Sequence, residues 1–539
     1  MLNFLKNMFS LSDENSKNEN TNENTKTLEY ENTTVSDTLE HNKKIIHAIF
    51  SNCSDLIIRE VKITNNPQFG AMLVYINNMT KAGLIEETII QKLTQKNEIY
   101  AYNPNSKKYS QYLLGVRDED IFMDMSKVVE SILSGKLVLF IDGINEALII
   151  NINNPPGRNV EEPQVESVIR GPREGFTESI ATNIALIRKK IKSTNLKMES
   201  YIIGRETRTD VVIAYLSNIA NEKIVSEVKE RLNKIDIDAV LSANYIKEYI
   251  EDEPTGVFPT INSTEKPDVL AGKLLEGRIA IIIDGTPLVI TVPAIFIEFL
   301  VTNEDYNFKF IPATVNRWIR YISLIISTTL PGIYLAITTF HQELIPTPLL
   351  ITFMKTRSDV PYPASVECFI MLFAYEILRE AGVRMPKAVG QSISVVGAVV
   401  LGQAAVEAGI VSTPMVLLVA ITSISAFAVP STDMTAALIL PRFLLLFLGS
   451  ILGLLGVTSG IVVVCIKLIS IRSFGVPYMG PIAPFISNEI ADVFVRRPIW
   501  VKFRRSWLIT RKHSVKRKLK SHIKSIKEEH KKAMEKNKN

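Results

Sequence analysis

The sequence predicts an α+β duplicated N-terminal domain followed by an α-helical transmembrane domain, and three observations support this prediction. Polar and apolar residues are segregated along the chain, since 22% of the residues are charged and the mean hydropathy is still +0.15. Two segments of the first half match two later segments at nearly equal offsets. Almost all long apolar runs lie between residues 318 and 471. A chain of 539 residues is long enough for several domains.

The start of the chain has a composition of its own. Residues 10–42 are rich in Asn, Glu, Ser and Thr and contain hardly an aromatic residue. Such a segment cannot bury enough apolar surface to offset the entropy of ordering. We therefore expect residues 1–42 to be disordered.

The duplication rests on two matches. The first pairs residues 71–79 with residues 212–219 and places Tyr75 and Tyr215 at an offset of 140 residues. The second pairs residues 133–143 with residues 275–285, at an offset of 142 residues. Two separate matches at nearly one offset indicate one duplicated unit. We expect α+β subdomains at residues 43–160 and 199–315, joined by a connecting helix within residues 161–198.

Each copy is predicted to contain a short strand, the strand with the tyrosine, a helical region and two final strands. The expected strands lie at residues 56–63, 71–77, 137–141 and 145–151 of the first copy and at residues 199–204, 210–216, 279–283 and 287–292 of the second; the expected helices lie at residues 82–95, 221–233 and 242–250. In the connecting segment, Thr177 is expected to cap a helix with Ile180, Ile184, Ile187 and Ile191 on one face.

The Asp-Gly pairs at Asp142 and Asp284 have two interpretations. Asp-Gly between apolar runs is what a type I′ hairpin turn requires, and this interpretation is favoured. The alternative is a pair of metal-binding carboxylates.

The second half contains the membrane segments. A span needs about 20 apolar residues, and four segments qualify: residues 318–340, 389–411, 415–429 and 443–471. Residues 364–378 are apolar but contain Glu367 and Glu376. We therefore expect a membrane domain at residues 316–475 with about four spans and a re-entrant or interfacial segment within residues 345–380. A break at Gly456–Gly460 would instead divide the last run and make six spans.

The positive charge of the chain is concentrated at its end. From Arg496 onward there are seventeen Lys or Arg and three Glu, a local charge of +14, while the whole chain has a net charge of +5. A basic block after the last apolar run follows the positive-inside rule and suits anionic lipid headgroups better than nucleic acid. We expect residues 476–539 to be a juxtamembrane segment and a basic cytoplasmic tail, and the N-terminal domain to lie on the same side.

Motifs of soluble enzymes are missing from the sequence. It contains no HExxH, GxSxG, GxxxxGK[ST] or GxGxxG, and its three cysteines have no CxxC spacing. We expect no catalytic, cofactor-binding or metal-binding residues.

Polar residues within the apolar half are the candidate functional residues, because an ionisable group at membrane depth is costly. The ionisable candidates and one amide partner are Glu367, Glu376, Gln403, Glu407 and Asp433. A stripe of small or weakly polar residues shares one face of the second span: Gln391, Ser394, Ala398, Gly402, Ala405 and Gly409. Such a stripe lines a water-filled path or lets another helix approach closely, and the sequence leaves both open.

Five segments of the sequence resemble one family. They are residues 159–176, the runs 266–268, 275–278 and 284–287 taken together, the run His341-Gln-Glu-Leu-Ile-Pro-Thr-Pro-Leu-Leu, the run Glu376-Ile-Leu-Arg-Glu-Ala-Gly-Val-Arg and the run Ser473-Phe-Gly-Val-Pro-Tyr. Together they are similar to the A-subunit family of spore germinant receptors, the GerA family, over about residues 45–500.

The resemblance implies a non-enzymatic nutrient germinant receptor subunit in the spore inner membrane, with its N-terminal domain and tail facing the spore core. It implies a transporter-like B subunit and a lipoprotein C subunit as partners, contact with membrane lipid, and a homo-oligomer around an ion-conducting pore. Two alternatives stay open at this point. One is a stage V sporulation paralog of the family that acts in ion release, and the other is a solute carrier, although the spans show no paired halves.

Overall fold

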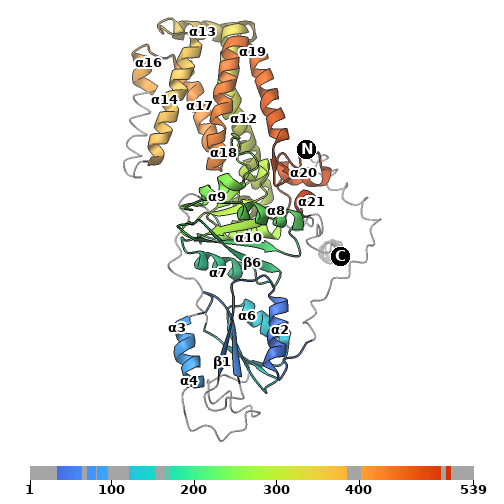
Figure 1. The fold of residues 1–539 in the computed structure, drawn as a ribbon. Coiled ribbons are helices and arrows are strands. Elements are labelled where there is room, and N and C mark those ends of the chain that lie inside the picture. Colours follow the sequence, from blue (N-terminus) through green and yellow to red (C-terminus); the bar gives the residue numbers. More distant parts are fainter. Residues whose placement is uncertain are drawn as a thin grey trace, which may run out of the picture. The chain divides into compact units, whose positions relative to one another are not determined.

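The computed structural model describes residues 33–62, 70–80, 82–94, 120–152, 166, 170–384, 402–498 and 505–510. The chain divides into two compact units, Met1–Ser51 with Asp55–Pro155 and Asn52–Ser54 with Pro156–Asn539. Each unit contains one five-stranded sheet whose described strands are all antiparallel (Figure 1).

The first unit has its sheet in the order β1-β2-β4-β5-β3. The strands are β1 (Leu56–Lys62), β2 (Gly70–Ile76), β3 (Ile121–Phe122), β4 (Leu137–Ile141) and β5 (Ala147–Ile150). Alternate residues of β2 point to opposite faces. Leu73 and Tyr75 pack with the helical run α3 (Ala82–Ile85), η2 (Glu86–Ile90) and α4 (Gln91–Thr94). Helix α6 (Met125–Leu133) packs on β2 and β4, and α2 (Leu39–Ile49) packs on β2.

The second unit repeats this order as β6-β7-β9-β10-β8. Its strands are β6 (Leu196–Ile203), β7 (Thr209–Leu216), β8 (Asn262–Thr264), β9 (Ile279–Ile283) and β10 (Val289–Val292). Helices α8 (Glu222–Asn233) and α9 (Ala243–Ile250) share a core with one face of this sheet. Helices α7 (Ile180–Lys190) and α10 (Pro267–Leu275) share a core with the other.

The equal strand orders confirm the duplication that the sequence predicts. The expected strands differ from the observed ones by only a few residues at their ends. The sequence missed the short strands β3 and β8 and the helices α6 and α10, which occupy the same place in each copy.

The N-terminal boundary differs from the expectation. Residues 33–42 were expected within the disordered segment, but Val35 is buried and α2 begins at Leu39. The side chain of Asn42 is buried and bonds both the N–H (2.9 Å) and the carbonyl (2.7 Å) of Ser36. A polar composition here serves a helix start, since Asn and Ser satisfy free backbone groups. The remaining residues of the expected disordered segment lie outside the described residues.

The second copy uses the same device. Asn183 bonds the N–H (2.8 Å) and the carbonyl (2.6 Å) of Thr177, and the N-cap of α7 is Ser179 rather than Thr177. Ile187 and Ile191 are buried in the core that α7 shares with the second sheet. The helix expected as a connector therefore packs within the second subdomain.

The Asp-Gly pairs form turns of a different type from the one predicted. Gly143 and Gly285 both have a φ of 81°, whereas Asp142 and Asp284 do not have positive φ, and a type I′ turn needs positive φ at both positions. The carboxylates have a second role. Asp142 accepts a hydrogen bond from the N–H of Leu39 at 3.3 Å, and Asp284 accepts one from the N–H of Ile180 at 3.0 Å. Each carboxylate thus caps the first helix of its copy.

The helical part of the second unit follows β10. Its main helices are α12 (Phe310–Phe340), α13 (Thr347–Arg357), α14 (Ala364–Arg384), α16 (Ala405–Glu407), α17 (Thr413–Phe427), α18 (Thr432–Ala437) and α19 (Ile439–Ser470). Helices α12, α14, α17 and α19 form a bundle, and α13 lies across the end farther from the second sheet (Figure 1). Among the described residues, two helical stretches are long and apolar enough to cross a membrane, Phe310–Phe340 and Thr432–Ser470.

Helix α19 folds back on itself at Gly453, where φ is 62° and ψ is −144°. A Cβ on Gly449 would lie 3.0 Å from Val457, and one on Gly460 would lie 2.6 Å from Leu445. In a straight helix, residues 445 and 460 would be about 22 Å apart at 1.5 Å per residue. The last apolar run is therefore two antiparallel arms, with the break near the place that the six-span alternative required.

Candidate functional site

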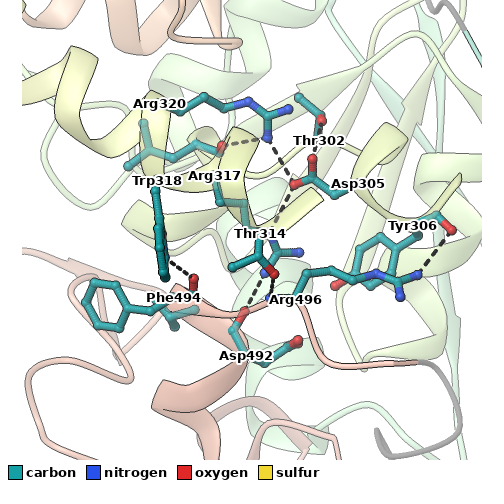
Figure 2. A network of polar contacts seen from close by, with 12 residues as sticks. Thr302, Asp305, Tyr306, Thr314, Arg317, Trp318, Arg320, Asp492, Phe494 and Arg496 are labelled. Atoms are coloured by element: carbon teal, nitrogen blue, oxygen red, sulfur yellow. Dashed lines mark hydrogen bonds and ion pairs between the residues drawn. The ribbon is translucent and has the colours of Figure 1, made fainter. Parts of the chain in front are cut away.

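A buried ion network links the start of α12 to the second subdomain. Its centre is Asp305 on α11 (Glu304–Asn307), whose side chain is 1% exposed. Asp305 lies 3.0 Å from Arg317 Nε and 3.0 Å from Arg320 Nη1 (Figure 2). Arg317 and Arg320 are three residues apart and therefore share one face of α12. Without these partners the buried carboxylate would carry a large desolvation cost.

The same face of α12 binds the end of α20 (Ser487–Phe494). Arg317 donates to the carbonyl of Asp492, and Trp318 Nε1 donates to the carbonyl of Phe494 at 2.8 Å (Figure 2). The hydroxyl of Tyr321 donates to the carbonyl of Val493 at 2.7 Å. The last carbonyls of a helix lack intrahelical partners, and a cation there complements the helix dipole. Side chains of α12 thus cap α20 and fasten the C-terminal segment to the first long helix.

Tyr306 completes the network. The guanidinium carbons of Arg317 and Arg496 lie 5.8 Å and 5.5 Å from the centre of its ring. Arg496 also donates from its backbone N–H to Thr314 Oγ1 at 3.2 Å and from Nη2 to the Tyr306 carbonyl at 3.2 Å (Figure 2). Cation–π contacts of this kind stabilise guanidinium groups removed from water.

A second buried cluster adjoins the network within the subdomain. Glu298 accepts a hydrogen bond from Arg278 Nε at 2.8 Å and lies 3.7 Å from Lys273 Nζ. Burial lowers the pKa of Lys273. Burial also raises the pKa of Glu166, which accepts a hydrogen bond from Thr264 at 2.7 Å.

Comparison of the two copies shows which charges of this cluster are specific to the second copy. At the 142-residue offset, Lys273 and Glu276 correspond to the uncharged Ser131 and Ser134, whereas Arg278 corresponds to Lys136. Both copies have the same strand order although Lys273 and Glu276 have no charged counterpart in the first copy.

Other helix ends are also fastened to the second subdomain. Lys247 of α9 lies 2.7 Å from Asp433 of α18, and Glu253 lies 2.8 Å from Lys467 near the end of α19. Asp433, which the sequence analysis placed among the intramembrane candidates, therefore belongs to this junction. Farther along the chain, Ile509 lies in the same core as α8 and α9.

Within the bundle, Glu376 pairs with two arginines. Arg442 Nη1 lies 2.7 Å from one oxygen of Glu376, and Arg379 Nη2 lies 2.9 Å from the other. Arg442 is fully buried and also donates from Nε to the carbonyl of Ser327 at 2.6 Å. These three side chains carry one surplus positive charge, so this cluster would repel a cation.

Glu367 is held at the start of α17. One carboxylate oxygen accepts hydrogen bonds from the N–H and the hydroxyl of Ser412, both at 2.6 Å, and the other lies 3.8 Å from Arg357 Nε. Ser412 is the N-cap of α17. A carboxylate at a helix N-terminus is favoured by the helix dipole, so Glu367 anchors α14 to α17.

The predicted stripe is only partly described. Gln391, Ser394 and Ala398 lie outside the described residues. Gly402 and Ala405 are half-buried, and a Cβ on Gly402 would meet no atom of the described residues within 4 Å. Gly409 has a φ of 66° and follows the last turn of α16, so it does not continue the helical face. Gln403 bonds Glu407 at 3.0 Å, as their i, i+4 spacing allows, and both side chains are exposed.

Close backbone contacts occur instead between α12 and the first arm of α19. A Cβ on Gly332 would lie 2.7 Å from the Leu445 carbonyl oxygen, and one on Gly449 would lie 2.6 Å from the Gly332 carbonyl oxygen. This seam, Arg442 and the junction residues other than Asp433 were missed in the sequence. Arg442 had a visible signal, because it is the only charged residue between Asp433 and Lys467. Within the described residues, no group of His, Cys, Asp and Glu could hold a metal ion.

Comparison with known proteins places the chain in a family. The model of the family described as Bacillus/Clostridium GerA spore germination protein matches residues 44–507. The chain belongs to this GerA family. Spore germination protein KA of Bacillus subtilis (strain 168) is 43% identical over 86% of this chain and 85% of that protein. An uncharacterized membrane protein of the same organism, YfkQ, is 41% identical over 87% of this chain and 91% of its own length.

A solved structure is also similar to part of this chain. It is the N-terminal domain of the A subunit of the Bacillus megaterium spore germinant receptor GerK3, at 36% identity and a TM-score of 0.39. The match covers 49% of this chain and 98% of that domain. Membership of the GerA family supports a role in spore germination, and the apolar helices fit a location in a membrane.

Proposed function

We propose that this chain is the A subunit of a nutrient germinant receptor in the spore inner membrane, and that it conducts ions as a homo-oligomer when germination is triggered. The observation that carries the proposal is the junction. Buried or close ion pairs fasten the start of α12, α18 and the end of α19 to one α+β subdomain. A movement of that subdomain would therefore act on several membrane helices together.

The ion path is proposed to lie between neighbouring subunits of the homo-oligomer. The interior of one bundle holds the surplus positive charge of the Glu376, Arg379 and Arg442 cluster. Gln403 and Glu407 are exposed at the surface of the bundle, beside Gly402. These two side chains were expected on a different face from the stripe, so a contact with a neighbouring subunit is proposed for them. The stripe Gln391, Ser394, Ala398, Gly402 and Ala405 is proposed to face the axis of the oligomer.

The proposed topology has six crossings: α12, α14, the span expected at residues 389–411, α17 and the two arms of α19. Trp318 and Phe340 are about 33 Å apart along α12 at 1.5 Å per residue, close to the roughly 30 Å of a hydrocarbon core. Ile509 packs with the second subdomain, which supports an even number of crossings. The basic tail supports an orientation in which this side faces the spore core.

The proposed partners are a transporter-like B subunit, a lipoprotein C subunit and membrane lipid, without nucleic acid. The chain itself is proposed to be non-enzymatic. Subunit number tests the central claim. The full chain, purified in detergent, is expected to sediment as a ring-sized homo-oligomer and to release monovalent cations from liposomes. A monomer that takes up a solute without cation release would favour a carrier instead.

A further inference from the structure

The hydrogen-bond ladder of α12 is interrupted at Pro331. Proline has no N–H, so the carbonyl four residues earlier, that of Ser327, loses its intrahelical donor. An unpaired carbonyl is costly at membrane depth, where no water replaces the missing donor. The carbonyl of Ser327 therefore needs a donor from another element.

Arg442 of α19 supplies that donor. Its Nε lies 2.6 Å from the Ser327 carbonyl oxygen, and its Nη1 lies 2.7 Å from Glu376 of α14. The side chain of Arg442 is fully buried. One guanidinium group thus joins three helices, and the atom that it binds on α12 is the one that Pro331 leaves free.

The residues around Pro331 favour bending of α12 at this point. The hydroxyls of Ser327, Thr328 and Thr329 bond back to carbonyls three or four residues earlier, a pattern that bends helices. On the other side, Gly332 touches the backbone of α19 at Leu445. Because Gly332 has no side chain, the two helices can rotate against each other at this contact without a side chain having to move out of the way.

We propose that Pro331 is a hinge in α12 and that Arg442 is the latch that holds it. The segments of α12 before and after Pro331 change their relative direction only when the Arg442 guanidinium leaves the Ser327 carbonyl. The latch deepens the proposed function and rests on it for its role, because the junction at the start of α12 would act on the bundle through this hinge. Arg442 Nη2 has no hydrogen-bond partner among the described residues, which leaves one donor for a second arrangement.

A double-mutant cycle on the full chain in detergent tests the latch. Arg442→Gln should lower the melting temperature clearly in the wild-type background. In the Pro331→Ala background, residue 331 has an N–H for Ser327, so the same substitution should lower the melting temperature by half as much or less. Pro414→Ala is the matched control. Pro414 lies in the first turn of α17, where no carbonyl waits for its N–H, so the full loss should persist there.

Equal losses from Arg442→Gln in the wild-type and Pro331→Ala backgrounds would overturn the latch. If Arg442→Gln does not fold at all, Arg442→Lys keeps a charge beside Glu376 and is tested in the same cycle. Recovery of either variant by Pro331→Ala supports the latch, and recovery of neither overturns it. This cycle measures thermal stability and not ion release, so its outcome can overturn the latch without overturning the proposed function.

Discussion

At the scale of single residues, the decisive feature is how buried charges are paired. Asp305 serves two arginines, and its side chain is 1% exposed. The exposed pair Arg205 and Asp236 has a shorter contact, at 2.5 Å against 3.0 Å for Asp305, with side chains 64% and 69% exposed. Burial rather than distance decides which pair matters, because water screens the exposed pair and not the buried one.

Replacement of Asp305 tests this difference. Asp305→Asn leaves Arg317 and Arg320 buried without a counter-charge and should destabilise the protein by about 3 kcal/mol. Asp236→Asn, the matched exposed control, should leave the melting temperature nearly unchanged. Chemical denaturation of the purified chain measures both. A small effect of Asp305→Asn would show that the network at the start of α12 is not held by this carboxylate.

The capping carboxylates give a second residue-scale prediction. Asp142→Asn and Asp284→Asn should cost little stability, because an amide oxygen can accept the same N–H of Leu39 or Ile180. Asp142→Ala and Asp284→Ala remove the acceptor and should each cost about 1 kcal/mol. Thermal unfolding compares the four variants. Loss of function in a folded Asn variant would argue for a role beyond the cap.

At the scale of elements, strands and soluble helices were largely predictable because the tyrosine strands and the strands beside Asp142 and Asp284 alternate or run apolar between turn residues. The break in α19 was harder, because Gly453 lies in a run containing several glycines and only one of them has positive φ. The junction could not be predicted, because Asp305 and Asp492 are 187 positions apart and their contacts depend on tertiary packing. The stripe was expected to continue to Gly409, but Gly409 has a positive φ that the sequence did not indicate.

The cluster beside α10 makes the stability depend on pH. Burial raises the pKa of Glu166, so the folded state disfavours the ionised form. The contribution of Glu166 is therefore most favourable below its unfolded pKa, near the ordinary glutamate value of 4.5, and is lost as the pH rises through the folded pKa. Glu166→Gln should raise the melting temperature at pH 7 to 8, and the two proteins should converge towards pH 4.5. A gap that does not change with pH would contradict this.

At the scale of the whole molecule, glycines packed within one subunit have no space for a side chain, whereas a glycine proposed to lie between subunits has space in its own subunit. A Cβ on Gly332 or Gly449 would meet backbone atoms of the same subunit, whereas one on Gly402 would meet no described atom within 4 Å. The same substitution at these positions therefore distinguishes a packing seam within a subunit from the proposed path between subunits.

Gly402→Leu should leave the amount of folded protein in spores unchanged and should alter spontaneous or triggered cation release. Gly449→Leu should lower the amount of protein, because its side chain has no space beside Gly332. Immunoblots and cation release are measured on the same spores. Parallel loss of protein and release in Gly402→Leu would remove the stripe from the path.

The topology gives a last prediction. In a variant without Cys465, Lys234→Cys lies on the subdomain and Lys355→Cys on α13 at the other end of the bundle, and both positions are exposed. An impermeant thiol reagent outside right-side-out membrane vesicles should label residue 355 at once and residue 234 only after permeabilisation. The reverse pattern would invert the proposed orientation.

The fold-back of α19 bears on how the chain is made. Its two arms contact each other over a separation of only about fifteen residues, so they can pair as soon as both have left the ribosome. In the proposed topology the two arms are the last two crossings, and such a hairpin would enter the bilayer as one piece, so that the residues after it need not be carried across. The positive φ of Gly453 makes the reversal easy for glycine and strained for any other residue. Biogenesis of the last two crossings would then depend on a single backbone position at the tip.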